Sequence, residues 1–114
     1  MKHKDDCLRQ CVARVTKIPP RRVPHFVGKY KDRWFRHLGT WLGRRGWFVV
    51  LCNATDTIAY IPKSAPHIEI GPTSRGKRKR RHAVVCKGPL PVYTGGRPLL
   101  KTERYLFLFR ERRQ

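Results

Sequence analysis

The chain has few acidic residues: seven Asp and Glu stand against 27 Lys and Arg, and the formal net charge is +20. It also lacks any run of about 20 apolar residues, the length that a membrane-spanning helix requires. The opening MKHKDD leads into a mixed segment rather than into the apolar block of a signal peptide. We therefore expect a cytoplasmic protein with no membrane partner.

Tightly paired zinc-binding cysteines are missing as well. Cys7 and Cys11 lie four residues apart, on one face of a predicted helix, while Cys52 and Cys86 each end an apolar run. We interpret Cys11, Cys52 and Cys86 as small buried side chains. A zinc site that combines Cys7 and Cys11 with histidines stays open as an alternative, although their spacing is Cys-x-x-x-Cys and no second pair follows. We expect no cofactor and no metal.

The length of the chain favours a single core. With 114 residues, 39% of them hydrophobic, it can bury one modest core and is too short for two. No internal repeat is visible. We therefore expect one domain over residues 1–114 and a monomer.

Apolar residues recur at helical spacing in the first part of the chain. The predicted segments are a helix from Cys7 to just before Pro19-Pro20, a helical hook over Pro20 to Val27, and a longer helix with the apolar stripe Tyr30, Trp34, Leu38, Trp41 and Leu42, which Gly46 ends. Asp6 is the predicted cap of the first helix. Val23 and Phe26 are predicted to hold the hook on the core, and a structural role is expected for His25.

From Trp47 onward the period changes to that of strands. The predicted strands are Trp47 to Leu51, Ile58 to Ile61, Ile68 to Ile70, His82 to Cys86, Val92 to Thr94 and Tyr105 to Phe109, the first of them a central strand. Helices first and strands afterwards predict an α+β domain, with N-terminal helices packed on a C-terminal antiparallel sheet.

Two residues carry the chemistry that the pattern indicates. Cys7 lies in the first turn of the first predicted helix, where unpaired backbone amides and the helix dipole favour thiolate over thiol, while Asp5 and Asp6 act in the opposite direction. His82 opens an apolar strand after a glycine- and arginine-rich loop. A thiol and an imidazole at such positions are the two halves of a nucleophile and base pair.

Several motifs carry a resemblance to a known family. They are Asp6-Cys7-Leu8-Arg9-Gln10-Cys11, Ile18-Pro19, Val23-Pro24-His25-Phe26, Gly71-Pro72-Thr73-Ser74-Arg75-Gly76 and His82-Ala83-Val84-Val85. Together and in this order they resemble a small papain-like cysteine-peptidase-type family of bacteria and phages. The resemblance implies a papain-like fold, with Cys7 as nucleophile, His82 as base, a peptide or protein substrate, and the cytoplasm of a bacterium or phage-infected cell.

Two positions depart from the pattern of that family. Where the family has an acid that orients the imidazole, this chain has Thr94, whose hydroxyl can orient the ring but cannot offset its positive charge. The glutamine that papain-like sites use before the cysteine for the oxyanion hole is also missing. The first hypothesis is therefore a hydrolase of peptide, isopeptide or amide bonds, with Cys7, His82 and Thr94 as its site. Its catalytic site is degenerate in this hypothesis, because Thr94 replaces the orienting acid.

Basic residues are most densely clustered in one segment of the chain, and this cluster supports a second hypothesis. It consists of Arg75, Lys77, Arg78, Lys79, Arg80 and Arg81. Such a run favours an anionic ligand. The alternative function is thus a catalytically inactive, phage-type binding module for nucleic acid or an acidic host protein. Helix-turn-helix and zinc-finger spacings are missing, so single-stranded or structured RNA fits better than duplex DNA.

Overall fold

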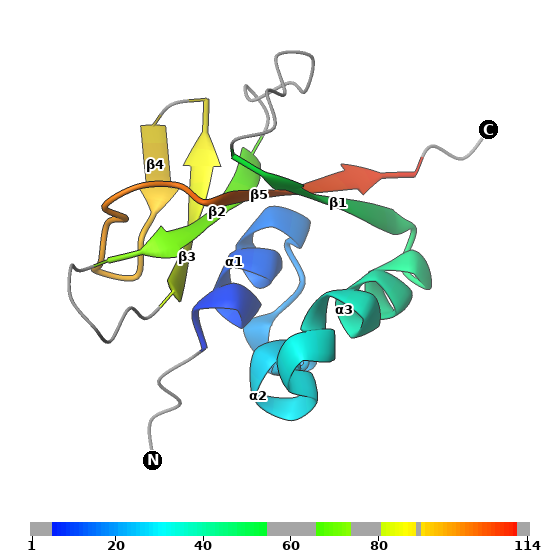
Figure 1. Cartoon of the computed structure of the whole chain (residues 1–114). Helices are drawn as coiled ribbons and strands as arrows, with labels where there is room; N and C mark the ends of the chain where they lie inside the picture. Colours follow the sequence, from blue (N-terminus) through cyan, green and yellow to red (C-terminus); the bar gives the residue numbers. More distant parts are fainter. Residues whose placement is uncertain (1–5, 55–65, 74–80, 89, 112–114) are drawn as a thin grey trace.

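The computed structural model describes residues 6–54, 66–73, 81–88 and 90–111. Within these ranges the protein is an α+β fold in which helices pack on one face of a five-stranded antiparallel sheet (Figure 1). The predicted fold class is confirmed at this level of architecture. No helix in the described ranges has both the length and the apolar character needed to cross a membrane.

The helical part of the chain precedes the sheet. Its elements are α1 (Cys7–Thr16), a 3-10 turn at Pro20–Arg22, α2 (Phe26–Tyr30), a second 3-10 turn at Lys31–Arg33 and α3 (Trp34–Gly43). Val23 and Phe26 are 1% and 2% exposed. The prediction that they hold the hook on the core is confirmed.

The single long helix predicted around the apolar stripe is wrong. Lys31 has a φ of 54°, in the left-handed region, and this breaks the helical path between α2 and α3. The stripe nevertheless faces the core, since Leu38 and Leu42 are fully buried. α3 ends at Gly43, so Gly46, with a φ of 82°, belongs to the turn before the sheet and does not end the helix.

α1 begins at Cys7, as predicted, but the side chain of Asp6 does not cap it. The Asp6 carboxylate instead accepts hydrogen bonds from Arg9 Nη2 at 3.1 Å and from Gln10 Nε2 at 3.0 Å. Lys17, with a φ of 62°, ends the helix two residues before Pro19. The capping prediction fails because the long side chains of the first turn compete for the carboxylate.

The sheet has the order β1-β5-β2-β3-β4, and every neighbouring pair is antiparallel. Its strands are β1 (Trp47–Asn53), β2 (Pro66–Pro72), β3 (Arg81–Lys87), β4 (Leu90–Tyr93) and β5 (Arg104–Arg110). The predicted strand Ile58 to Ile61 lies outside the described residues. Among the described strands, the segment Trp47 to Leu51 lies at an edge of the sheet and has half-exposed side chains, so its predicted central position is wrong.

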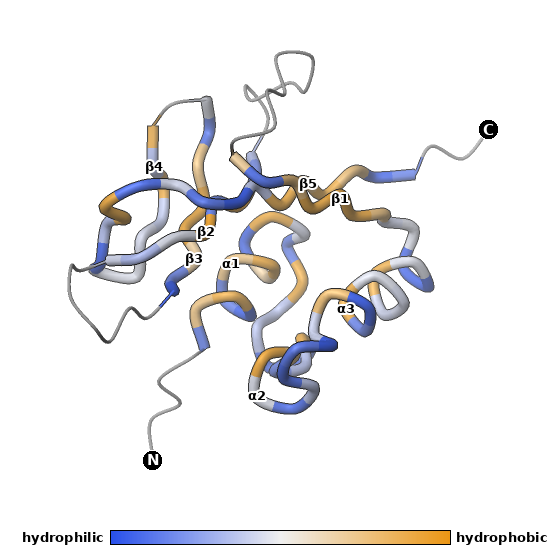
Figure 2. Tube along the Cα trace, in the orientation of Figure 1, coloured by the Kyte–Doolittle hydropathy of each residue, from blue (hydrophilic) through white to orange (hydrophobic). Residues whose placement is uncertain are grey.

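The core lies between α1 and the middle of the sheet. Cys11 and Val12 of α1 are fully buried, as are Ile68 of β2 and Leu106 of β5. Figure 2 shows the apolar residues along β1 and on turns of α1. Burial of one such aliphatic side chain stabilises a fold by about 1.5–3 kcal/mol. This packing fixes the position of α1 on β2 and β3.

Gly71 of β2 admits the backbone of a crossing loop. A Cβ at this position would overlap the carbonyl oxygen of Lys101. The loop is held there by backbone hydrogen bonds of 2.8 Å from Leu100 N–H to the Pro72 carbonyl and from Glu103 N–H to the Ile70 carbonyl. The backbone of β2 at Gly71 and the backbone of the loop at Lys101 would have to move apart to admit a Cβ. Such a movement would break these hydrogen bonds.

We expect Gly71→Ala to lower the free energy of unfolding by about 1–3 kcal/mol, the usual range for overpacking. Gly43→Ala is the matched control, because a Cβ there meets nothing within 4 Å at the end of α3, and it is expected to raise stability by up to about 1 kcal/mol. Urea unfolding followed by circular dichroism measures both. Equal midpoints for Gly71→Ala and the unaltered chain would contradict the packing argument.

Candidate active site

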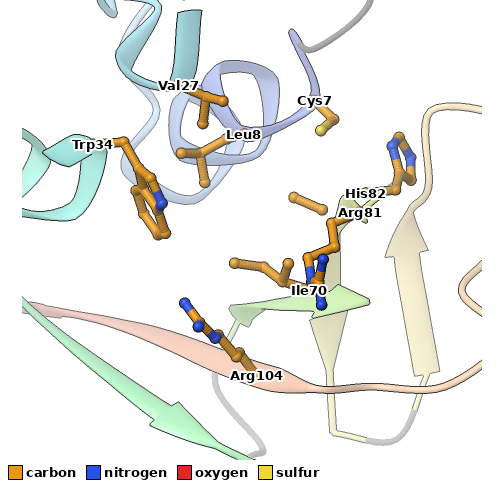
Figure 3. A pocket seen from close by; sticks show the side chains of 9 residues that line it. Cys7, Leu8, Val27, Trp34, Ile70, Arg81, His82 and Arg104 are labelled. Carbon is orange, nitrogen blue, oxygen red and sulfur yellow. The ribbon is translucent and has the colours of Figure 1, made fainter. Parts of the chain in front are cut away.

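The fold brings Cys7 and His82 to one cavity. α1 packs across β3, and a cavity of about 210 Å³ is lined by Cys7 at the start of α1 and by His82, the second residue of β3 (Figure 3). Both side chains belong to residues that are half-buried. A ligand in this space, which we call the Cys7–His82 cavity, would contact a thiol and an imidazole together.

His82 is oriented by a main-chain carbonyl. β4 pairs with Val85 to Lys87 of β3, and the turn that follows β4 lies beside His82. There the Nε2 atom of His82 is 2.6 Å from the carbonyl oxygen of Thr94. A carbonyl only accepts, so Nε2 must carry the proton, and in the neutral ring the lone pair then lies on Nδ1. This tautomer is able to accept a proton from a neighbouring thiol.

Thr94 thus reaches His82 through a different group from the one predicted. The predicted contact was with the threonine hydroxyl. In the structure this hydroxyl accepts a hydrogen bond of 3.2 Å from the N–H of Gly96 and closes the turn. Since the group that meets His82 belongs to the backbone, the residue type at position 94 does not reveal it.

The turn after β4 is held by two glycines and by α1. Gly95 and Gly96 have φ values of 63° and 84°, a region that disfavours other residues. Tyr93, just before the turn, lies under Arg14 of α1, whose Cζ is 3.7 Å from the ring centroid. Arg14 follows Cys7 by two helical turns and so shares its face of α1. The contact therefore ties the turn that orients His82 to the helix that carries Cys7.

The acid next to Cys7 is paired within its own turn. The Asp6 carboxylate forms an ion pair with Arg9 at 2.7 Å, and His25 Nε2 lies 3.9 Å from it. The Nδ1 atom of His25 accepts the N–H of Gly28 at 2.8 Å and caps α2, so the structural role predicted for this histidine is confirmed. The negative charge of Asp6 at the start of α1 is thus offset by Arg9.

The other cysteines have different environments. Burial raises the pKa of Cys11, and burial, followed by the charge of Glu69 and a hydrogen bond to it, raises the pKa of Cys86 to about 12. Both are therefore thiols at neutral pH, the unreactive form. Cys52 is half-buried in β1 rather than buried as predicted. All four cysteines lie in the described residues, and no two of them form a disulfide.

The rest of the Cys7–His82 cavity combines apolar walls with two arginines. The apolar side chains are those of Leu8, Val27, Trp34, Ile70 and Ala83. Arg81 and Arg104 line the sheet side of the cavity (Figure 3). The Nε atom of Arg81 is 2.9 Å from Glu103 Oε1. Arg104 has no ion pair with any residue of the described ranges. The cavity therefore suits a ligand with an apolar group and a negative charge.

The basic run that was predicted to bind anions is described only at its end. Arg75, Lys77, Arg78, Lys79 and Arg80 lie outside the described residues. Arg81 opens β3 and is paired with Glu103. Sequence reasoning missed Arg104, although the alternation of β5 gave a signal, because Arg104 falls in step with the core residues Leu106 and Leu108.

Comparisons with protein-family models, curated proteins and solved structures find no significant match to the chain. A papain-like relationship therefore stays a proposal. Cys7, His82 and Thr94 are the residues whose geometry bears on function.

We expect Thr94→Ala to leave the His82 tautomer unchanged, since the main-chain carbonyl remains. Gly95→Ala should disturb it, because a Cβ in the left-handed region costs about 1–2 kcal/mol and displaces the turn. Two-bond ¹H–¹⁵N NMR of the ring nitrogens reports the tautomer of each variant. A change in Thr94→Ala as large as that in Gly95→Ala would show that the carbonyl alone does not orient His82, and that the hydroxyl and its hydrogen bond to Gly96 are needed.

Proposed function

We propose that the protein is a papain-like cysteine hydrolase that acts on a peptide, isopeptide or amide bond, with Cys7 as nucleophile and His82 as base. The observation that carries the proposal is the position of Cys7 and His82 on one cavity, with Nε2 of His82 held by Thr94. That bond leaves Nδ1 as the basic atom of the ring, and a cysteine hydrolase needs one basic imidazole nitrogen near its thiol.

The first half of the reaction forms a thioester. His82 takes the proton of the Cys7 thiol, and the thiolate attacks the carbonyl carbon of the substrate. The carbon–nitrogen bond then breaks, and the imidazolium of His82 returns the proton to the leaving amine. The acyl group remains on Cys7 Sγ.

The second half releases the acid. A water molecule gives a proton to His82 and attacks the thioester carbonyl, and the carbon–sulfur bond breaks. The proton returns to the departing sulfur, which restores Cys7. An amine in place of water would give acyl transfer by the same steps.

The negative oxygen that forms in each half needs hydrogen-bond donors. The six residues printed before Cys7 include no glutamine. The side chain of Asp6, however, does not cap the first turn of α1, because it is engaged by Arg9 and Gln10. Amide groups of this turn are therefore the donors that we assign to the oxyanion.

The Thr94 carbonyl orients His82 but carries no full negative charge. A carboxylate at this place would also stabilise the imidazolium that forms during the reaction. We therefore expect a slower hydrolase than one with an acid in this position. Thioesters and activated amides have good leaving groups, which depend least on proton transfer from the imidazolium of His82. We expect such reactive substrates to be the ones least affected by the missing carboxylate.

The lining of the Cys7–His82 cavity indicates the class of substrate. Trp34, Val27 and Ile70 would accept an apolar side chain, and Arg104 would pair with a nearby carboxylate of the substrate. The net charge of +20 attracts acidic polypeptides to the protein as a whole. We therefore propose an acidic protein or peptide with an apolar residue beside the bond that is cleaved.

A binding module for nucleic acid or an acidic protein is the alternative function. It depends on the basic run that ends at Arg81, and Arg81 is already paired with Glu103. It requires no Cys7–His82 pair. The described residues thus give more support to the hydrolase.

Iodoacetamide tests whether Cys7 is an activated thiol. Near neutral pH we expect Cys7 to react much faster than Cys52, which is the half-buried comparison thiol of the same chain. Cys11 and Cys86 should react after unfolding, because burial keeps them protonated in the fold. Mass spectrometry of the alkylated peptides gives the four rates. Equal rates at Cys7 and Cys52 would reject the hydrolase.

His82→Gln tests the base with a side chain of similar size. The excess reactivity of Cys7 should disappear, and turnover of any substrate should fall by about 10²–10⁴-fold, the usual contribution of a general base. His37→Gln is the control, since His37 stacks on Tyr30 away from the cavity lining. If His82→Gln leaves the Cys7 rate unchanged while the fold is intact, His82 is not the base.

Arg104→Ala tests the charge preference. Two peptidyl electrophiles that differ in one residue, Glu against Gln, would be compared by their rate of reaction with Cys7. We expect Arg104→Ala to slow the Glu probe by about tenfold or more, since a charge-assisted hydrogen bond contributes about 1.5–3 kcal/mol, and to leave the Gln probe unchanged. Arg110→Ala, at the other end of β5, is the matched control. An equal loss for both probes would contradict carboxylate recognition.

A further inference from the structure

A second group of reactive side chains lies on the face of the sheet opposite α1. His67 and Glu69 are two residues apart on β2 and so share a face. Cys86 of β3 is the direct cross-strand partner of His67. Ile68 and Val85, which alternate with them, belong to the core under the helices. Strand geometry alone therefore gathers an imidazole, a carboxylate and a thiol on the far face.

The three side chains already converge. One ligand atom from each of His67, Glu69 and Cys86 lies within 4.8 Å of the others. The Nε2 atom of His67 is 2.8 Å from Glu69 Oε2, and the sulfur of Cys86 lies within the same 4.8 Å cluster. A tetrahedral zinc ion with bonds of about 2.0–2.3 Å places its ligands roughly 3.5 Å apart. Zinc binding at this cluster therefore requires side-chain rotations that bring the ligand atoms to that spacing.

The surroundings hold this cluster in place. His67 and Cys86 are 1% and 4% exposed, and the ring of His67 stacks on Phe107 with centroids 5.3 Å apart. Thr102 donates its hydroxyl to Oε1 of Glu69, the oxygen that does not face His67. A hydrogen bond to the second oxygen of a metal-binding carboxylate is the usual way in which proteins orient such a ligand.

The cluster also has access to space. A cavity of about 260 Å³ is lined by Glu69 and Cys86, together with Lys101, Thr102 and other residues of the segment before β5. It provides room for a water molecule as a fourth ligand. Lys101 brings a positive charge to the rim, while the carboxylate of Glu69 and a thiolate of Cys86 would balance a divalent ion.

We propose that His67, Glu69 and Cys86 bind one zinc ion and leave its fourth position open to this cavity. Nitrogen, oxygen and sulfur donors in one set suit zinc, whereas calcium and magnesium take oxygen ligands. On binding, the Cys86 thiol releases its proton to solvent. The sequence predicted no metal. The three ligand residues form no recognisable spacing in the sequence, because they come from two strands. The proposal is independent of the hydrolase.

Cobalt(II) is a spectroscopic probe for this site in the full chain. The background is Cys7→Ser, so that the thiol of the Cys7–His82 cavity does not contribute. We expect one cobalt ion per chain, tetrahedral visible bands and a thiolate-to-cobalt charge-transfer band, with zinc displacing cobalt. Cys86→Ser should remove the charge-transfer band, while Cys52→Ser should retain it. A band that persists in Cys86→Ser, or no binding to the folded chain, would overturn the proposal.

Thr102→Val tests the site without a change in any ligand. It removes the hydrogen bond to Glu69 Oε1, and zinc affinity in calorimetry should fall by about 10–100-fold. Glu69→Gln keeps the shape of the ligand and should weaken zinc binding further, so it decides the matter if Cys86→Ser fails to fold. Unchanged zinc affinity in both folded variants would likewise overturn the site.

Discussion

The packing of α1 on β3 is the contact on which both the core and the candidate site depend. Cys11 lies one helical turn after Cys7, and its complete burial against the sheet turns the same face of α1 toward β3. Arg14, further along that face, meets Tyr93 and reaches the hairpin. The apolar contacts that stabilise the fold are thus the ones that bring Cys7 to the cavity that His82 also lines, and a change in the tilt of α1 would alter both the core and this cavity.

The sequence was informative where periodicity reports burial. The helical spacing of Leu8, Cys11 and Val12 located α1, and the alternation of β2, β3 and β5 located most of the sheet. The fold class followed from the order of these elements. The break at Lys31 was not predictable, because a left-handed residue between two helices leaves the apolar spacing nearly intact. The edge position of β1 also escaped prediction, since strand order is set by long-range pairing.

The site was predictable only in its side chains. Cys7 and His82 carry a pattern of residue type and position, which sequence reasoning can read. The partner of His82 is a backbone carbonyl, a group that every residue has, and so the pattern at position 94 was uninformative. The far-face cluster was missed for another reason: Cys86 meets His67 through strand register, and register is a tertiary property.

The segment between β4 and β5 contacts three polar side chains of β2 and β3 that belong to the two candidate sites. Its first residue, Thr94, holds His82; Thr102 holds Glu69; and Glu103 holds Arg81. Backbone hydrogen bonds from Leu100 and Glu103 fasten it to β2. One ten-residue segment of backbone therefore holds side chains of β2 and β3 at the same time. A substitution that displaced this segment would disturb His82 and Glu69 together.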